Sequence, residues 1–225
     1  MSLYAISDLH LSLSADKPMD VFRGWEDYVN RIKQNWTRIV GEEDTVVIPG
    51  DISWALALDD AAADFAFINS LPGKKIILKG NHDLWWSTAK KLREFLEKNK
   101  FDTISFVFNN AVEVENFAVC GTRGWFYDLK GENKVVLREA GRLETSIKAA
   151  LDTGLKPVVF THYPPVYGDW VCDEIFEVIK KYDIKTVYHG HIHGSGFHNA
   201  KSSFEGVQFK LLSADCVNFT PLMIV

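Results

Sequence analysis

Short apolar runs rich in β-branched residues recur along the chain, and longer segments with a helical period separate many of them. Such runs are typical of buried strands. We expect strands at residues 3–6, 45–48, 75–78, 104–108, 112–114, 117–120, 158–160, 186–188, 207–212 and 222–225. Apolar residues at spacings of three and four, or Ala- and Phe-rich stretches, predict helices at about 21–40, 57–71, 87–98, 135–151 and 173–182.

This order of elements favours an α/β fold. Strands that alternate with helices build layered α/β cores, and the closer succession of the later strands indicates a second sheet. We therefore expect a β-sandwich flanked by helices, with ligands bound on the loops that follow the strands. Ser87 is the expected N-cap of the third helix. No repeat or linker interrupts the chain, so a single domain over residues 1–225 is expected.

Charge and composition exclude some classes of function. The formal net charge of −5 argues against broad binding of duplex nucleic acid, which requires a basic surface. A small anionic substrate remains compatible, because bound metal ions can invert the local field. The three cysteines are far apart, as expected for free thiols. With no signal peptide and no apolar run of membrane-spanning length, we expect a cytoplasmic protein that does not enter membranes.

Five polar segments, most of them directly after a predicted strand, carry the candidate chemistry. They are Asp8-Leu9-His10, Gly50-Asp51, Gly80-Asn81-His82-Asp83, His162 and Gly190-His191-Ile192-His193. Carboxylate oxygen and imidazole nitrogen are ligands of divalent metals. Taken alone, each segment has an ordinary explanation as a turn or as a structural histidine. Together and in this order, they predict a centre that binds two metal ions.

The five segments resemble the pattern D-x-H, G-D, G-N-H-[DE], H and G-H-x-H of the calcineurin-like metallophosphoesterase superfamily. The resemblance extends from Asp8 to His193, nearly the whole chain. It implies a four-layer α/β/β/α sandwich, in which two mixed β-sheets are flanked by helices. It also implies hydrolysis of phosphoester bonds at a binuclear metal centre.

Ligands follow from the resemblance by matching positions. One ion would be held by Asp8, His10, Asp51 and His193. The other ion would be held by Asp51 as the bridge, together with Asn81, His162 and His191. Manganese, iron and zinc all suit these ligand types, which do not choose among them.

The resemblance also implies the catalytic step. A water activated by the two ions would attack phosphorus. His82 resembles the histidine of the family that is not a ligand and that stabilises the phosphoryl group or protonates the leaving group. Asp83 is expected to orient His82 by accepting its second N–H.

Two local departures bear on the substrate. The segment from Gly50 to Trp54 lacks the G-D-x-x-D-R-G signature of the protein serine/threonine phosphatases, so an enzyme of that type is not expected. The segment Thr161-His162-Tyr163-Pro164-Pro165 resembles the bacterial cyclic-nucleotide and glycerophosphodiester phosphodiesterase branch. We therefore expect a small phosphoester substrate, with diesters slightly preferred over monoesters.

Substrate contacts are expected from Trp54, Trp125 and Arg123. Aromatic rings can stack on a base or a sugar, and an arginine can bind phosphate with two hydrogen bonds. The alternatives are that the tryptophans pack beneath the loops and that Arg123 forms an ion pair. His198 lies outside every motif and is expected at the surface. The charged segment at 128–134 is expected to be a solvent-exposed loop that could serve as a lid.

A different class of function stays open at this point, namely a binding or scaffold protein on the same fold without catalysis. Members of the superfamily that have lost catalysis usually lack several ligands, whereas none is missing here. Metal content and the turnover of a generic phosphodiester distinguish the two hypotheses.

Overall fold

The computed structural model describes residues 1–125 and 133–225. The loop expected at 128–134 therefore lies mostly outside the described residues. Its last two residues already belong to helix α4 (Asn133–Asp152).

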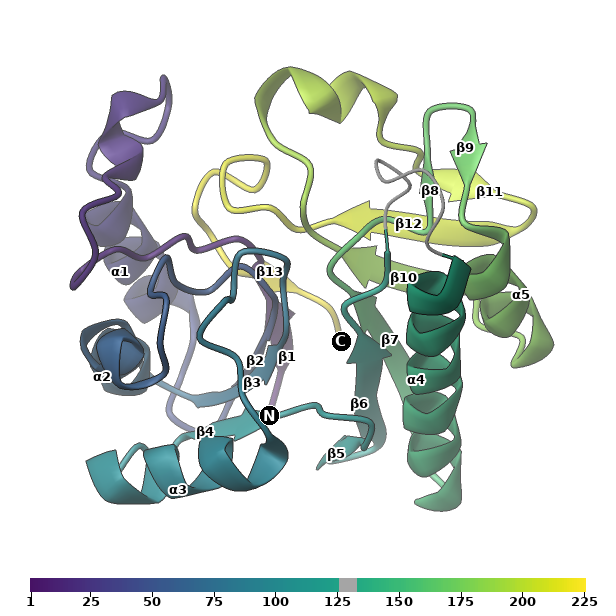
Figure 1. Cartoon of the computed structure of the whole chain (residues 1–225), viewed down its shortest axis with the longest axis horizontal. Coiled ribbons are helices and arrows are strands. Elements are labelled where there is room, and N and C mark those ends of the chain that lie inside the picture. Colours follow the sequence, from purple (N-terminus) through teal and green to yellow (C-terminus); the bar gives the residue numbers. More distant parts are fainter. Residues whose placement is uncertain (126–132) are drawn as a thin grey trace.

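Two mixed sheets form the centre of the molecule (Figure 1). The first has five strands, in the order β13 (Leu222–Met223), β1 (Leu3–Ala5), β2 (Thr45–Pro49), β3 (Lys74–Leu78) and β4 (Ile104–Phe106). The second has six, in the order β11 (Ser203–Phe204), β12 (Val207–Leu211), β10 (Thr186–His189), β7 (Lys156–Thr161), β6 (Phe117–Thr122) and β5 (Val112–Val114). All neighbours run parallel except β13 with β1, β11 with β12 and β5 with β6.

Helices cover the outer faces of both sheets (Figure 1). On one side lie α1 (Tyr28–Ile39), α2 (Ala62–Ser70) and α3 (Ala89–Asn99), and on the other lie α4 and α5 (Asp173–Lys181). Shorter elements are the 3₁₀ turns Met19–Val21, Asp59–Ala61 and Gly194–Asn199, and a hairpin of β8 (Val166–Tyr167) and β9 (Trp170–Val171). Within the described ranges, no helix combines the length and the apolar character needed to cross a membrane.

Alternation along the strands explains the layers. Successive side chains of a strand point to opposite faces. In β2, Val46 and Ile48 pack against the helices, whereas Val47 packs between the sheets. In β7, Val159 faces its helices, and Phe160 faces the other sheet. Three separate apolar clusters result, and the predicted four-layer α/β/β/α architecture is confirmed.

Several predicted boundaries were wrong. The first helix begins at Tyr28 rather than at residue 21, because Gly24 and Asp27 have φ angles of 92° and 53°, outside the helical range. Thr88 rather than Ser87 caps α3, because its extended backbone lets the hydroxyl oxygen accept a hydrogen bond from Lys91 N at 3.3 Å. The β8–β9 hairpin was not expected from the sequence.

Candidate metal centre

All five polar segments follow parallel strands and meet at one edge of the two sheets. They come after β1, β2 and β3 of the first sheet and after β7 and β10 of the second. The carboxyl ends of parallel strands share one edge, which is where α/β sheets bind ligands. The edge carries every predicted ligand: Asp8, His10, Asp51, Asn81, His162, His191 and His193.

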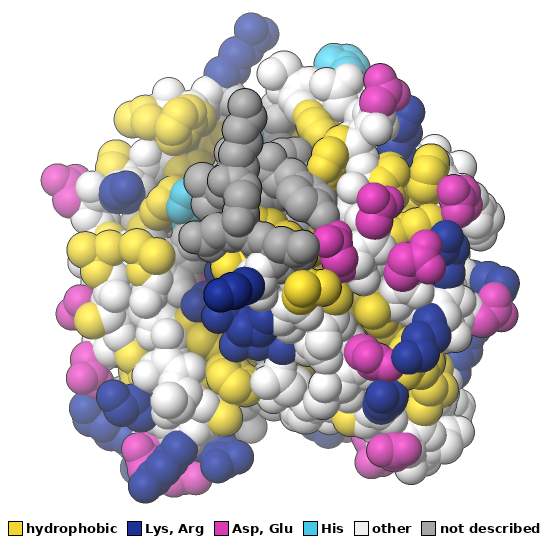
Figure 2. All heavy atoms as spheres, turned by 45° about the vertical axis from the view of Figure 1, so that its right-hand side comes forward, with side chains coloured by type: hydrophobic (Ala, Val, Ile, Leu, Met, Phe, Trp, Pro, Cys, Tyr) yellow, Lys and Arg dark blue, Asp and Glu magenta, His cyan; other side chains and the backbone are white. Residues whose placement is uncertain are grey.

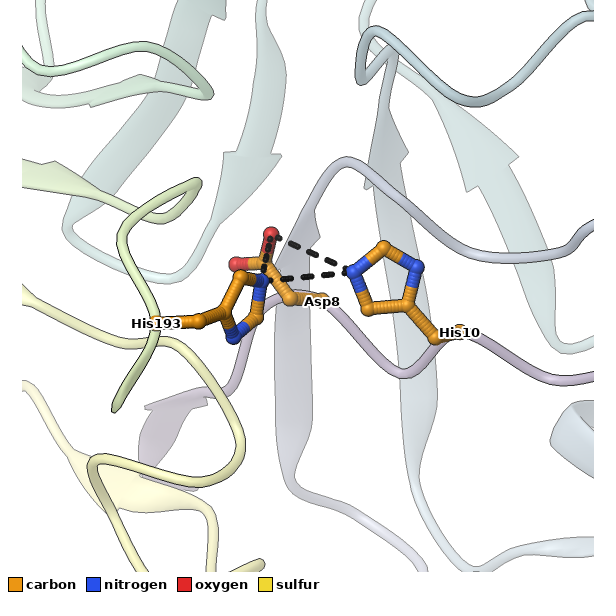
Figure 3. A group of neighbouring side chains, drawn as sticks. All are labelled: Asp8, His10 and His193. Atoms are coloured by element: carbon orange, nitrogen blue, oxygen red, sulfur yellow. Dashed lines mark hydrogen bonds and ion pairs between the residues drawn. The ribbon is translucent and has the colours of Figure 1, made fainter. Parts of the chain in front are cut away.

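One group of potential ligands consists of Asp8, His10 and His193 (Figure 3). The carboxylate oxygen Oδ1 of Asp8 lies 4.0 Å from His10 Nε2 and 3.4 Å from His193 Nε2. The two Nε2 atoms are 3.3 Å apart. Their ligand atoms thus converge on one point, although the residues come from opposite ends of the chain.

A second group consists of Asp8, Asp51 and His162. Asp51 lies between the two groups, since its Oδ2 is 3.7 Å from His10 Nε2 and 3.5 Å from His162 Nε2. This is the position that a bridging carboxylate requires.

Asn81 extends the second group. Its Oδ1 lies 2.7 Å from His162 Nε2 and 2.9 Å from His191 Nδ1. The neutral amide oxygen of Asn81 thus lies between the His162 and His191 rings, close to the negative charge of Asp51. Carboxylate oxygens, imidazole nitrogens and an amide oxygen facing one another are the donor set of a metal centre, and these residues fit two ions.

Burial sets the protonation of two of the histidines. His10 and His162 are almost completely shielded from solvent. Burial disfavours the charged imidazolium and lowers the pKa of each residue to about 3. Both rings are therefore neutral near pH 7, and the neutral ring is the form that binds metal.

The carboxylates respond to their neighbours. Burial opposes the charged form of Asp8, but the hydrogen bond and the charge of His193 outweigh it and lower the pKa of Asp8. Burial and the nearby Asp8 and Asp83 raise the pKa of Asp51. For His193, burial is outweighed by Asp215 and Asp8, which raise its pKa to about 10. Crowded negative charge of this kind favours a bound cation.

The backbone of the site is held in uncommon conformations. Asp8, His10, Asp51 and His191 have φ angles of 60°, 46°, 53° and 73°. Residues other than glycine rarely adopt such angles, which cost about 1–3 kcal/mol each and cluster at functional sites. Gly80 lies too close to Asp51 for any side chain, because a Cβ there would lie only 2.1 Å from Asp51 Oδ1.

Asp83 acts differently from the prediction. Its buried carboxylate accepts hydrogen bonds from the backbone N–H groups of Asp51, Ile52 and Gly80 at 3.0, 2.8 and 2.7 Å. It also accepts one from Trp85 Nε1 at 3.1 Å. Among the described residues, none of its hydrogen bonds comes from the His82 ring. Asp83 therefore ties the loop after β2 to the loop after β3 and does not orient His82.

His82 stands beside the two ligand groups without joining either. Its exposed ring lies 5.7 Å from the His10 ring and 4.4 Å from the Trp54 ring. Burial lowers the pKa of His82. Trp54 also stacks on His10 at 5.0 Å. Trp54 thus packs against both histidines and remains partly exposed. This packing agrees with the alternative stated above, in which the tryptophan supports the loops of the site.

Arg123 and Trp125 lie at the end of β6. The guanidinium of Arg123 is 3.5 Å from Glu139 Oε1 and 4.8 Å from the centre of the Trp125 ring. Arg123 therefore forms an ion pair, which was the alternative to a phosphate contact. Its backbone carbonyl accepts hydrogen bonds from His162 N and Tyr163 N at 3.1 and 2.9 Å, which places it next to a predicted ligand. His198 is exposed, as expected.

Sequence reasoning missed two residues that hold ligands in place. Asp215 Oδ1 is 2.8 Å from His193 Nδ1, and its Oδ2 accepts a hydrogen bond from Gly194 N at 3.0 Å. Ser213 donates its hydroxyl proton to Asp8 Oδ2 at 3.1 Å. Both follow β12, so the rule that polar residues after a strand mark the site could have identified them.

Comparisons with known proteins agree with this geometry. A family model described as calcineurin-like phosphoesterase matches residues 1–195. No curated protein matches the chain.

Similar solved structures include a protein of unknown function from Aquifex aeolicus, at 17% identity and a TM-score of 0.55, with 99% of this chain and 95% of that chain covered. A Thermus thermophilus protein has 13% identity and a TM-score of 0.58, covering 99% and 97%. Phosphopantetheinyl hydrolase from Mycobacterium tuberculosis has 12% identity and a TM-score of 0.51, covering 100% and 95%. At these identities the likeness concerns the fold.

Proposed function

The chain belongs to the calcineurin-like phosphoesterase family and is a metallophosphoesterase, and we propose that it hydrolyses small phosphodiesters in preference to monoesters at a centre of two metal ions. One observation supports this most strongly. Ligand atoms from five loops converge into two groups, with Asp51 between them and His82 beside them.

The ligands divide as the family pattern suggests. One ion would be held by Asp8, His10, Asp51 and His193, and the other by Asp51, Asn81, His162 and His191. When bound, manganese, iron or zinc ions would neutralise charge on the phosphoryl oxygens and lower the pKa of a water molecule. Water adds across the phosphorus–oxygen bond, and an alcohol and a phosphomonoester leave.

The protein's own residues would act on the substrate around the ions. His82 would donate a hydrogen bond, or a proton, to the oxygens on which charge develops. Asp83 is a positioning residue, since it fixes the loops that present Asp51 and Asn81. Trp54 gives the His82 side of the site an apolar wall, which suits an organic substituent of the phosphate, and a diester carries two of these where a monoester carries one.

A scaffold protein without catalysis has less support. Every ligand position of the pattern is filled, and the side chains converge. No contact in the described residues favours a scaffold role.

Chelation tests the proposal. Removing metal from the purified protein should abolish the turnover of an aryl phosphodiester, and adding back manganese, iron or zinc should restore it. A parallel series of mono- and diesters, cyclic nucleotides included, tests the preference. Activity that persists after metal removal would contradict the metal-dependent mechanism, whereas faster turnover of monoesters would contradict only the diester preference.

Replacing Asp215 by alanine should weaken metal binding by about 10–100-fold, because the residue that fixes the His193 ring would be lost. Asp215→Asn keeps an acceptor oxygen and should lose less. A metal titration against a competing chelator measures the effect. Asp169→Ala, a change at an exposed carboxylate, is the control. An unchanged metal affinity in Asp215→Ala would show that Asp215 does not support the ligand.

A further inference from the structure

A cavity of about 250 Å³ lies next to the metal centre and contains none of its predicted ligands. Lys79 and Arg123, at the ends of β3 and β6, contribute to its lining, and Arg142 lines it from α4. Lys79 precedes Asn81 by two residues, so their Cα atoms lie within about 7 Å. The backbone carbonyl of Arg123 accepts a hydrogen bond from His162 N. Two lining residues are therefore close to residues of the second ligand group, one by position in the chain and one by a backbone hydrogen bond.

Positive charge dominates this cavity. Lys79, Arg123 and Arg142 line it, and the only carboxylate among its lining residues, all of them in the described part of the chain, is Glu139. Three cations against one carboxylate leave an excess of two positive charges. Figure 2 shows a group of Lys and Arg side chains near the middle of this face of the molecule. We call this site, lined by Lys79, Arg123, Glu139 and Arg142, the basic cavity.

Glu139 cannot neutralise the basic cavity further. The carboxylate is 1% exposed and already accepts hydrogen bonds from Thr122 Oγ1 at 2.7 Å, Arg142 Nη1 at 2.6 Å and Arg123 Nη2 at 3.5 Å. It therefore holds the two guanidinium groups in place as a fixed anchor. In the described part of the chain, the other N–H groups of Arg123 and Arg142 do not bind Glu139.

Two donors of the basic cavity lack a partner in the described ranges. The buried Nε of Arg123 has no acceptor there, and the half-buried Lys79 has no carboxylate within ion-pair distance. A buried donor without an acceptor is energetically unfavourable. Ser87 and Asn109 add a hydroxyl and an amide to the lining. The cationic and polar side chains that line this solvent-accessible space suit an anion with several oxygens.

We propose that the basic cavity binds a second phosphate group of the substrate, one that is not hydrolysed. This inference rests on the proposed function, which places the scissile phosphate at the metal centre. The substrate class is then an organic phosphoester that carries another phosphate a short distance away. The guanidinium groups offer paired N–H donors to that phosphate, and Lys79 supplies an unpaired charge.

Non-hydrolysable inhibitors that carry either one or two phosphonate groups test the proposal. Alkane bisphosphonates with increasing spacer length are compared with alkyl monophosphonates on the full-length, metal-loaded protein in phosphate-free buffer. Titration calorimetry measures binding. At the best spacer length, the bisphosphonate should bind at least about tenfold more tightly, because its second group binds without a new bimolecular encounter.

Variants locate the second group. Lys79→Gln and Arg142→Gln should each bring the affinity ratio of bisphosphonate to monophosphonate close to one. Arg138→Gln removes the same charge from an exposed position of α4 outside the cavity and should keep the ratio. If Arg142→Gln does not fold, because Arg142 pairs with Glu139, Lys79→Gln still tests the site, since Lys79 has no ion pair in the described residues to lose.

The outcomes separate this inference from the proposed function. A ratio near one at every spacer length in the wild-type protein, or a ratio that both cavity variants retain, would overturn the inference even if phosphodiesters are hydrolysed. A protein that turns over no phosphoester with any metal would contradict the proposed function, whatever the bisphosphonate ratio. Binding is measured without turnover, so the two failures remain distinct.

Discussion

Replacing Asp51 by asparagine is expected to lower kcat/KM for an aryl phosphodiester by about 10³-fold or more and to remove bound metal. Asp51 Oδ2 lies within 3.7 Å of His10 Nε2 and within 3.5 Å of His162 Nε2, between the two ligand groups. Asparagine offers one neutral oxygen where both ions need shared negative charge. The loss of several kcal/mol of electrostatic stabilisation corresponds to this factor in rate.

Elemental analysis and steady-state kinetics on the same preparation check the prediction for Asp51. Asp59→Asn, at an exposed carboxylate that pairs with Lys98, is the matched control and should keep both metal and rate. Circular dichroism shows whether each variant is folded. A folded Asp51→Asn protein with full metal content and normal turnover would mean that Asp51 is not the bridge.

Replacing His82 by alanine is expected to lower kcat by about 10²–10⁴-fold while metal content stays the same. The His82 ring belongs to neither ligand group, and it contacts the Trp54 and His10 rings at the edge of the centre. Removing a group that donates to a developing charge costs this much in other enzymes. His198→Ala, at an exposed histidine, is the control.

The leaving group distinguishes two roles for His82. If His82 protonates the departing oxygen, His82→Ala should lose more rate with a phenyl ester than with a 4-nitrophenyl ester, since nitrophenolate needs little protonation. If it stabilises the phosphoryl oxygens, both esters should lose the same factor. Loss of metal from His82→Ala would instead identify His82 as a ligand or as a support for one.

The layers were predictable from the order of strands and helices and from the family resemblance. Val46, Val47 and Ile48 are all apolar, as expected for strands covered on both faces, and each face has its own core. Helix ends were less predictable, because a positive φ at Asp27 depends on how the preceding loop packs. Short hairpins such as β8–β9 carry little periodicity of their own.

The candidate ligands were assigned by matching positions to the family pattern, and most of the polar segments directly follow a strand that the sequence predicts. The roles of the supporting residues were harder to predict than their places, since the sequence does not show whether a carboxylate faces a histidine or a backbone N–H group. Asp83 was expected beside His82 and instead binds backbone N–H groups of two loops. Asp215 was overlooked because it belongs to no motif, although it contacts His193.

The distance along the chain between the ligands has a consequence for how the enzyme acquires its ions. His10 and His193 are 183 positions apart, and Ser213, which supports Asp8, follows Asp8 by 205 positions. During synthesis the amino-terminal ligands leave the ribosome long before their partners. Neither ligand group can therefore be complete, with its supporting contacts, until the last part of the chain has been synthesised.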